Sequence, residues 1–303
     1  GEMSSTSLEH CIRYSDPAEK ELSMCFNFHH LKVDYKDGNK WELMEPDYDR
    51  LKELFETWQT GMEKKNGWNA LFWCNHDQPR IVSRFGDEKK YRKESAKMLA
   101  TFIHMLRGTP YIYQGEELGM TNPGYEKIDE YRDVESINYY RILLDEGKTE
   151  EEALNILGQR SRDNGRSPMQ WNSEKYAGFS ESEPWIGVAK NYKYINVEVE
   201  EKDEDSVLNY YRKLVDLRKQ YEIIQDGSVE FLYGDQSEVF AYKRTLDGQE
   251  LIVLNNLTEN EVLLQEPADC KGYECLISNY IQENDKNSIK TLRPYESIVL
   301  LKL

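Results

Sequence analysis

The sequence has 303 residues, which at roughly 100–200 residues per domain corresponds to about two domains. Its 39 Lys and Arg against 56 Asp and Glu give a formal net charge of −17, which disfavours binding to nucleic acid or to an anionic membrane. With 39% hydrophobic and 12% aromatic residues the chain is too apolar for a disordered protein, and no apolar run reaches the roughly 18 residues of a membrane span.

The cysteines indicate the compartment and argue against a metal or cofactor site. They are few, odd in number and without a Cys-x-x-Cys pair, which favours free thiols in a reducing, cytoplasmic environment over disulfides or a zinc site. We therefore expect no metal and no cofactor. The five positions are Cys11, Cys25, Cys74, Cys270 and Cys275.

The first part of the chain alternates strand-like and helix-like patterns. Such alternation predicts an α/β fold with a parallel sheet, open or closed into a barrel. Gly61 is the expected end of the first helix of the series. In chain order the expected elements are a strand at Leu22–Phe28, a helix at Pro46–Trp58, a strand at Ala70–Cys74, a helix at Glu94–Leu106 and a strand at Pro110–Tyr113.

A polar, helical insertion follows. Thr149 and Glu152 form a capping box that predicts a helix over Glu150–Arg160. The stretch Ser161–Trp185 is rich in Gly, Ser, Pro and Arg and is expected to be a loop. Ser206 is the expected cap of the next amphipathic helix.

After about residue 222 the pattern changes to strands. Glu238–Thr245 and Glu250–Leu257 flank Asp247-Gly248, a typical hairpin turn. Ser297–Leu303 is expected to be the last strand. These features predict an antiparallel β domain that begins near residue 222.

The first candidate for chemistry is the polar run that follows the strand Ala70–Cys74. Because the carboxyl ends of parallel strands carry the active sites of α/β folds, His76 and Asp77 are candidate pocket residues. A turn at Gln78-Pro79 would aim both side chains at one pocket. The sequence leaves open whether this run is functional or only caps a helix.

Glu116 and Glu117 follow the next strand in the same way. Two glutamates that open a helix are more often partners of the helix dipole than pocket acids, and we expect the former here. Glu2, by position alone, is expected to be exposed and idle.

A basic segment follows the strand Leu22–Phe28. Long cationic side chains can donate charge-assisted hydrogen bonds to an anionic group at a pocket mouth. A solvated loop whose lysines are offset by Asp34 and Asp37 is an equally good interpretation. The basic side chains of this segment are His29, His30, Lys32, Lys36 and Lys40.

The stretch Arg160–Trp171 is dense in planar hydrogen-bonding and aromatic groups. Such groups suit the hydroxyls and ring faces of a sugar. A structural loop held by Arg–Asp pairs is the competing interpretation.

Four segments together resemble the α-amylase family, glycoside hydrolase family 13, in its oligo-1,6-glucosidase-like branch. Within this branch, Glu2-Met-Ser-Ser-Thr-Ser and Phe28-His-His-Leu-Lys-Val-Asp-Tyr35 resemble the subgroup that cleaves trehalose 6-phosphate. The order and spacing match over the whole chain. The four segments are Gly1-Glu2-Met3, Phe72–Arg80, Gly108–Glu117 and Ser161–Trp171.

The resemblance implies the fold and the domains. It implies that residues 1–222 form the second half of a catalytic (β/α)8 barrel, strands five to eight, with the helical insertion at about 125–185. Residues 223–303 would form a small antiparallel β-sandwich. The fold class is thus α/β, the C-terminal half of a TIM barrel followed by a β-sandwich domain.

The resemblance also implies retaining glycoside hydrolysis by a carboxylate pair. Glu2 matches the family's general acid/base, and Asp77 matches the carboxylate that stabilises the oxocarbenium-like transition state. His76 matches a donor to a sugar hydroxyl, and Arg166 matches a substrate-pocket arginine.

The family's nucleophile motif, of Gly-Phe-Arg-x-Asp type, does not occur in this sequence. In the family it precedes the residue that Glu2 matches. We therefore expect this chain to be the C-terminal half of the enzyme, to need the missing N-terminal half as its partner, and to be inactive alone.

The expected substrate is a small phosphorylated disaccharide, trehalose 6-phosphate, split into glucose and glucose 6-phosphate. Lys32 and Lys40 are the expected ligands of the phosphate, with His29 and His30 beside them. Two alternatives stay open. One is an oligo-1,6-glucosidase acting on isomaltose-like sugars, and the other is a non-catalytic relative of the transporter-associated kind.

Overall fold

Four short parallel strands form the first sheet of the protein. The computed structural model describes residues 1–281 and 287–303. The sheet has the order β1-β2-β3-β4, and each neighbouring pair is parallel. The strands are β1 (Glu2–Met3), β2 (Cys25–Asn27), β3 (Asn69–Leu71) and β4 (Thr109–Pro110).

Helices separate these strands along the chain, which is the strand–helix alternation of a (β/α)8 barrel. The described strands form part of such a barrel, as the sequence predicts. The helices are α1 (Leu8–Ser15) after β1, α2 (Tyr48–Lys64) after β2, α3 (Ile81–Phe85) and α4 (Arg92–His104) after β3, and α9 (Val207–Gln220) after β4.

The strands are shorter than their apolar patterns predict. The backbone N–H of Leu22 donates to the carbonyl of Tyr14 at 2.8 Å, at the end of α1, so the residues before Cys25 are not in the sheet. After Leu71 the chain stays buried through Cys74 without pairing. Burial without strand pairing explains why the sequence predicts a longer strand there.

Helix α2 passes through Gly61, the residue at which its end is expected, and continues to Lys64. A Cβ atom at position 61 would lie 2.4 Å from Cδ2 of Leu8. The glycine therefore provides room for the packing of α1 on α2, and the expectation that it ends the helix is wrong.

The insertion consists of helices with their own small core, centred on Tyr131, Leu143 and Leu157. The predicted capping box is confirmed: the N–H of Glu152 donates to Thr149 Oγ1 at 3.2 Å, and the N–H of Thr149 donates to Glu152 Oε2 at 2.7 Å. Its α-helices are α5 (Val134–Asp145), α6 (Glu150–Arg160) and α7 (Asp163–Arg166), and α8 (Val197–Lys202) follows the insertion.

The chain ends in two antiparallel sheets, and α10 (Ile223–Asp226) precedes them. The five-stranded sheet has the order β5-β6-β7-β11-β9, and β10 pairs with β8. The Asp247-Gly248 turn joins β6 to β7, as predicted. The strands are β5 (Ser228–Leu232), β6 (Val239–Leu246), β7 (Gln249–Asn256), β8 (Val262–Asp269), β9 (Glu274–Ser278), β10 (Ser288–Leu292) and β11 (Ser297–Lys302).

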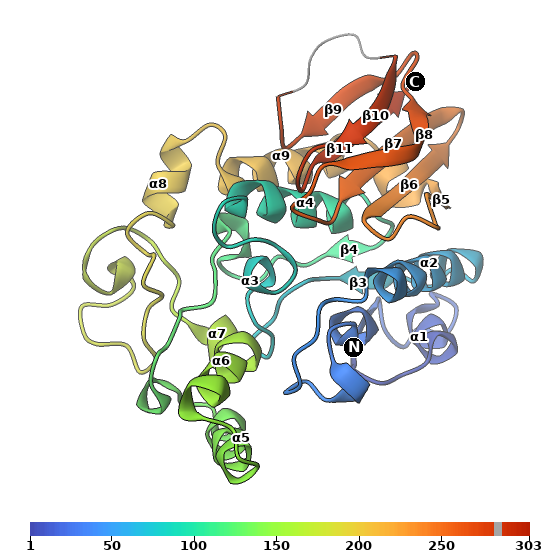
Figure 1. The fold of residues 1–303 in the computed structure, drawn as a ribbon. Helices are drawn as coiled ribbons and strands as arrows, with labels where there is room; N and C mark the ends of the chain where they lie inside the picture. Colours follow the sequence, from blue (N-terminus) through green and yellow to red (C-terminus); the bar gives the residue numbers. More distant parts are fainter. Residues whose placement is uncertain (282–286) are drawn as a thin grey trace.

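Both faces of the five-stranded sheet are buried. Val239, Ala241 and their neighbours pack in the core shared with β8 and β10. The alternate residues Phe240 and Tyr242 pack on the barrel helices. Phe240 stacks on Phe102 of α4 with ring centroids 3.7 Å apart, and Figure 1 shows the β domain lying against α4 and α9. Side chains along β6 alternate between the two faces of the sheet, and those on one face attach the β domain to the barrel.

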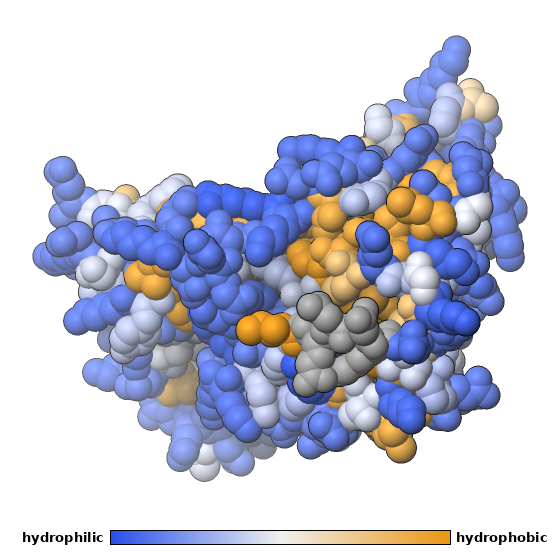
Figure 2. Space-filling model, turned by 90° about the horizontal axis from the view of Figure 1, so that it is seen from above, coloured by the Kyte–Doolittle hydropathy of each residue, from blue (hydrophilic) through white to orange (hydrophobic). Residues whose placement is uncertain are grey.

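The domain boundary that we propose near residue 222 falls between α9 and α10. No helix in residues 1–281 and 287–303 combines the length and apolarity needed to cross a membrane. Seen from above, the surface is mainly hydrophilic with hydrophobic side chains gathered in one area (Figure 2).

Candidate active site

Asp77 lies in a tight turn beyond the carboxyl end of β3. Asn75 Oδ1 accepts a hydrogen bond from the N–H of Asp77 at 2.8 Å, and the Asn75 carbonyl accepts from the N–H of Gln78 at 3.2 Å. This turn leaves the Asp77 side chain one third exposed, with His76 Nε2 3.6 Å from its Oδ2. The adjacent side chains therefore point to one place, as a turn at this position predicts.

Arg166, at the end of α7, holds this turn. Its Nη2 donates to Asp77 Oδ1 at 2.7 Å, and its Nε donates to the carbonyl of His76 at 2.8 Å. Gly165 permits the close approach, because a Cβ there would lie 2.4 Å from the carbonyl oxygen of Gln78. The structure thus brings together three of the expected site residues, His76, Asp77 and Arg166.

The chain of charges continues from Asp77 to the basic segment. Arg162 Nε lies 3.8 Å from Asp77 Oδ1 and 3.1 Å from Glu135 Oε2. Lys40 Nζ donates to the same Glu135 oxygen at 2.7 Å. Asp133 joins at the other end, with its Oδ1 3.8 Å from Arg166 Nη1.

Sequence reasoning did not single out Glu135 and Asp133. Asp133 caps α5, accepting from the N–H of Ser136 at 3.0 Å, and Glu135 lies in the first turn of that helix. In sequence such acids are typical of any helix start. Only the three-dimensional contact with Arg162 and Lys40 distinguishes Glu135.

Glu2 lies on β1, at the edge of the parallel sheet, and is exposed. Two side chains of the basic segment contact residues that follow Glu2. Lys32 Nζ donates to the carbonyl of Ser4 at 3.1 Å, and His29 Nε2 donates to the carbonyl of Thr6 at 3.1 Å. The segment that follows β2 therefore lies against the segment that follows β1.

His30 has a different environment from its neighbours. It is 6% exposed, its Nε2 donates to the carbonyl of Phe72 at 2.9 Å, and the rings of Phe55 and Phe72 pack against it. Burial lowers its pKa to about 4, so the imidazole is neutral at physiological pH. His30 is therefore a packing residue, which corrects its expected place among the substrate-binding side chains.

A buried ion triad attaches the basic segment to the Asp77 turn. Arg84 Nε donates to Asp34 Oδ2 at 2.8 Å, and Arg160 donates to the same oxygen. Burial alone would raise the pKa of Asp34, but the hydrogen bonds and charges of the two arginines hold it below its ordinary value. Arg84 Nη1 also donates to Gln78 Oε1 at 2.7 Å, one residue after Asp77. The Arg–Asp interpretation of the Arg160–Trp171 stretch is thus confirmed for Arg160.

Glu116 differs from the expected partner of a helix dipole. It is 3% exposed, and the hydroxyl of Tyr211 donates to its Oε1 at 3.0 Å. Burial raises its pKa to about 8. The carboxyl is therefore held mainly protonated at neutral pH, in the interior of the protein.

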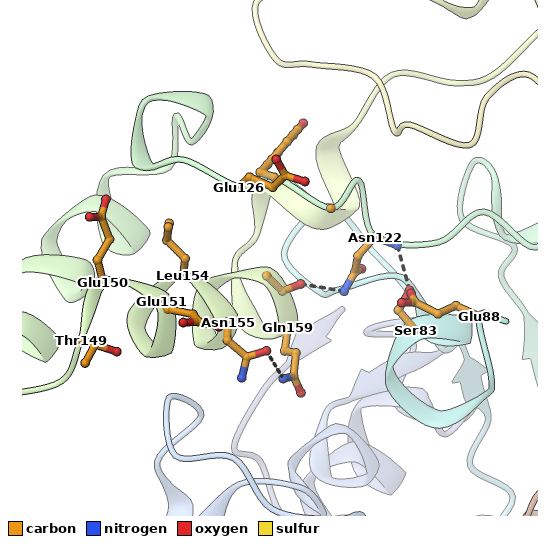
Figure 3. Close-up of a pocket in the computed structure, with 13 residues that line it drawn as sticks. Ser83, Glu88, Asn122, Glu126, Thr149, Glu150, Glu151, Leu154, Asn155 and Gln159 are labelled. Carbon is orange, nitrogen blue, oxygen red and sulfur yellow. Dashed lines mark hydrogen bonds between the residues drawn. The ribbon is translucent and has the colours of Figure 1, made fainter.

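A polar cavity of about 750 Å³ lies elsewhere, between α6 and the residues around Asn122 (Figure 3). None of the expected site residues lines it. In the described part of the chain, no group of three or more His, Cys, Asp or Glu is placed to hold a metal ion.

The comparisons with known proteins show which family the chain resembles. Residues 1–227 match the family model of the α-amylase catalytic domain, and residues 239–299 match the C-terminal domain of the α-amylase SusG. The chain is 51% identical to a trehalose-6-phosphate hydrolase of Bacillus subtilis, over 99% of this chain and 54% of that protein. It is 45% identical to an oligo-1,6-glucosidase of Bacillus cereus, with the same coverage.

A solved structure shows the same fold. The crystal structure of trehalose-6-phosphate hydrolase from Bacillus licheniformis aligns with a TM-score of 0.95 and 54% identity, over 99% of this chain and 55% of that one. The chain therefore spans about half the length of the relatives it matches. Together the family models, the relatives and the half-barrel of parallel strands show that the chain belongs to the α-amylase family of glycoside hydrolases.

Proposed function

We propose that the full-length protein is a retaining α-glucosidase that hydrolyses trehalose 6-phosphate to glucose and glucose 6-phosphate. The observation that carries the proposal is that two lysines are connected to the segments that bear the two candidate carboxylates. Lys32 contacts Ser4, two residues after Glu2, and Lys40 is linked through Glu135 and Arg162 to Asp77. Lysines thus lie on the segments around both carboxylates in a protein whose net charge is −17.

In this proposal Glu2 is the general acid/base. It protonates the glycosidic oxygen as the bond to the anomeric carbon breaks, and it later removes a proton from the water that releases the sugar. Its exposure at the start of β1 keeps the carboxylate accessible to substrate. We expect the nucleophile that forms the glycosyl-enzyme outside residues 1–303, because the relatives are about twice as long.

Asp77 stabilises the positive charge that develops on the sugar ring. Arg166 holds its Oδ1 and leaves the other oxygen near His76. The guanidinium has two of its N–H groups occupied by the turn, so it orients the carboxylate rather than moving with the substrate. His76, two thirds exposed, is placed to donate to a sugar hydroxyl.

Lys32 and Lys40 bind the phosphate, and His29 supports them. His29 is stacked on Trp58 at 5.4 Å and donates to Thr6, so its ring orientation is fixed. Lysine provides three donors on a flexible stem, which suits a phosphate oxygen. The five cysteines are free and four of them are buried, which supports a reducing, cytoplasmic location, where phosphorylated sugars are metabolic substrates.

An oligo-1,6-glucosidase activity is the second candidate, supported by the 45% identity to the Bacillus cereus enzyme. The deciding experiment compares kcat/KM of the full-length protein for trehalose 6-phosphate, trehalose and isomaltose. The proposal expects trehalose 6-phosphate to exceed trehalose by at least about tenfold, the effect of one charge-assisted contact. A preference for isomaltose supports the second candidate, and no turnover of any sugar supports a non-catalytic relative.

A further inference from the structure

Glu135 pairs with Lys40, one of the two lysines that the proposed function assigns to phosphate binding. Its Oε2 accepts from Lys40 Nζ at 2.7 Å and lies 3.1 Å from Arg162 Nε. One carboxylate oxygen thus meets two cationic side chains from two different segments. The Lys40 and Glu135 side chains are 21% and 38% exposed, so an incoming anion can reach the ammonium from solvent.

Lys40 does not depend on Glu135 for its position. The ammonium lies 4.5 Å from the ring centroid of Trp41, and the Trp41 ring stacks on Tyr139 at 4.6 Å. Trp41 is 4% exposed, and the adjacent Asn39 donates to the hydroxyl of Tyr139 at 3.4 Å. The segment is therefore fixed on α5 by aromatic packing. The Glu135 carboxylate neutralises the Lys40 ammonium but is not needed to position it.

The cluster is electrically balanced without substrate. Three cationic side chains alternate with three carboxylates, so each positive charge already has a negative neighbour. A substrate phosphate that binds Lys40 therefore competes with a carboxylate for the ammonium. The alternating series is Lys40, Glu135, Arg162, Asp77, Arg166 and Asp133.

We propose that Glu135 is a specificity-determining residue whose carboxylate is the resident counter-ion that a substrate phosphate displaces from Lys40. This inference rests on the proposed function, because it needs Lys40 to bind phosphate. A phosphate dianion carries more charge and more acceptor oxygens than one carboxylate, so it can compete for the ammonium. A neutral disaccharide cannot, and Lys40 then stays paired with Glu135.

Any anion that binds Lys40 in this way must first break its ion pair with Glu135. A partly exposed ion pair is worth little, so the competition lowers phosphate affinity by a small factor, about two- to fivefold. The same factor applies to inorganic phosphate, which carries the charge of the substrate group without the sugar. Inorganic phosphate is therefore the probe that isolates the effect.

The test measures inhibition of aryl α-glucoside hydrolysis by inorganic phosphate in the full-length protein. Glu135→Gln removes the charge and keeps the size of the side chain, and Glu135→Asp keeps the charge. Glu198→Gln on α8 is the matched control, because Glu198 pairs with Lys202 at 2.8 Å on an exposed surface. Glucose serves as the neutral competitive inhibitor.

The inference expects Glu135→Gln to lower the inhibition constant of phosphate about two- to fivefold, with that of glucose unchanged. It expects Glu135→Asp and Glu198→Gln to behave like the wild type. A phosphate constant that is unchanged or higher in Glu135→Gln overturns the inference, as does an equal shift for phosphate and glucose, which would show a structural role. If phosphate does not inhibit the wild type and trehalose 6-phosphate is not preferred, the proposed function itself fails.

Discussion

Arg166 contacts Asp77 and His76 with one guanidinium: Nη2 donates to the Asp77 carboxylate at 2.7 Å and Nε donates to the His76 carbonyl at 2.8 Å. The guanidinium thus holds the Asp77 side chain and the backbone of His76 at the same time. Lysine, with a single ammonium on a flexible stem, cannot reproduce both bonds in this geometry.

We therefore expect Arg166→Lys to lower kcat/KM about ten- to a hundredfold, since one charge-assisted hydrogen bond is worth roughly 1.5–3 kcal/mol. Steady-state kinetics of the full-length protein on its preferred sugar measures this. Arg212→Lys is the control, because Arg212 also pairs with a glutamate, Glu201, but on the exposed surface. Equal activity of the two variants would contradict the role of Arg166.

Glu2→Gln is expected to lower kcat on a disaccharide by about 10²–10⁴-fold, the usual contribution of a general acid. An aryl α-glucoside with an acidic phenol as leaving group needs no protonation, so its cleavage to the glycosyl-enzyme should lose much less. The measurement is the burst of phenol release beside turnover of the disaccharide. An equal loss for both leaving groups would show that Glu2 is not the acid.

Lys32→Ala is expected to reduce the preference for trehalose 6-phosphate over trehalose by about tenfold, mainly through KM of the phosphorylated sugar. Lys36→Ala is the matched control from the same segment, since Lys36 is 59% exposed and lies 3.9 Å from Glu42. The ratio of kcat/KM values for the two sugars is the readout. An unchanged ratio in Lys32→Ala excludes this lysine as a phosphate ligand.

Glu116 predicts a pH dependence of stability. Burial raises its folded-state pKa from 4.5 to about 8, so its protonated form stabilises the fold fully below pH 4.5 and this contribution is lost as the pH rises through 8. The loss amounts to about 1.4 kcal/mol per pH unit at most. Glu116→Gln keeps an acceptor for Tyr211 and should flatten the decline in the unfolding midpoint between pH 5 and 8. A parallel decline in both proteins would contradict this assignment.

Much of the fold could be predicted because its local signals agree with the tertiary structure. Thr149 and Glu152 satisfy each other at the start of α6, and Asp247-Gly248 adopts positive φ in the turn between β6 and β7. The end of α2 could not be predicted, because the need for Gly61 comes from Leu8 on another helix. The end of β3 could not be predicted for the same reason, because Phe72–Cys74 are buried by packing against helices rather than by strand pairing.

The site was predictable where a motif follows a strand and not where contacts cross the chain. The turn predicted after the strand brings His76 and Asp77 together, and Arg166 joins them in the structure. His30 and Lys32 share one segment, yet a 3-10 turn buries one and exposes the other, which composition does not reveal. Glu135 lies 95 residues from Lys40 in the chain, so its contact with that lysine has no local signal.

The most direct measurement for the proposed activity is the time course of trehalose 6-phosphate cleavage by the full-length protein, followed by proton NMR. The proposed activity predicts equal amounts of glucose and glucose 6-phosphate, with the glucose appearing as the α-anomer before it mutarotates, because a retaining mechanism passes through a glycosyl-enzyme. Release of the β-anomer, or cleavage of isomaltose without cleavage of trehalose 6-phosphate, would contradict it.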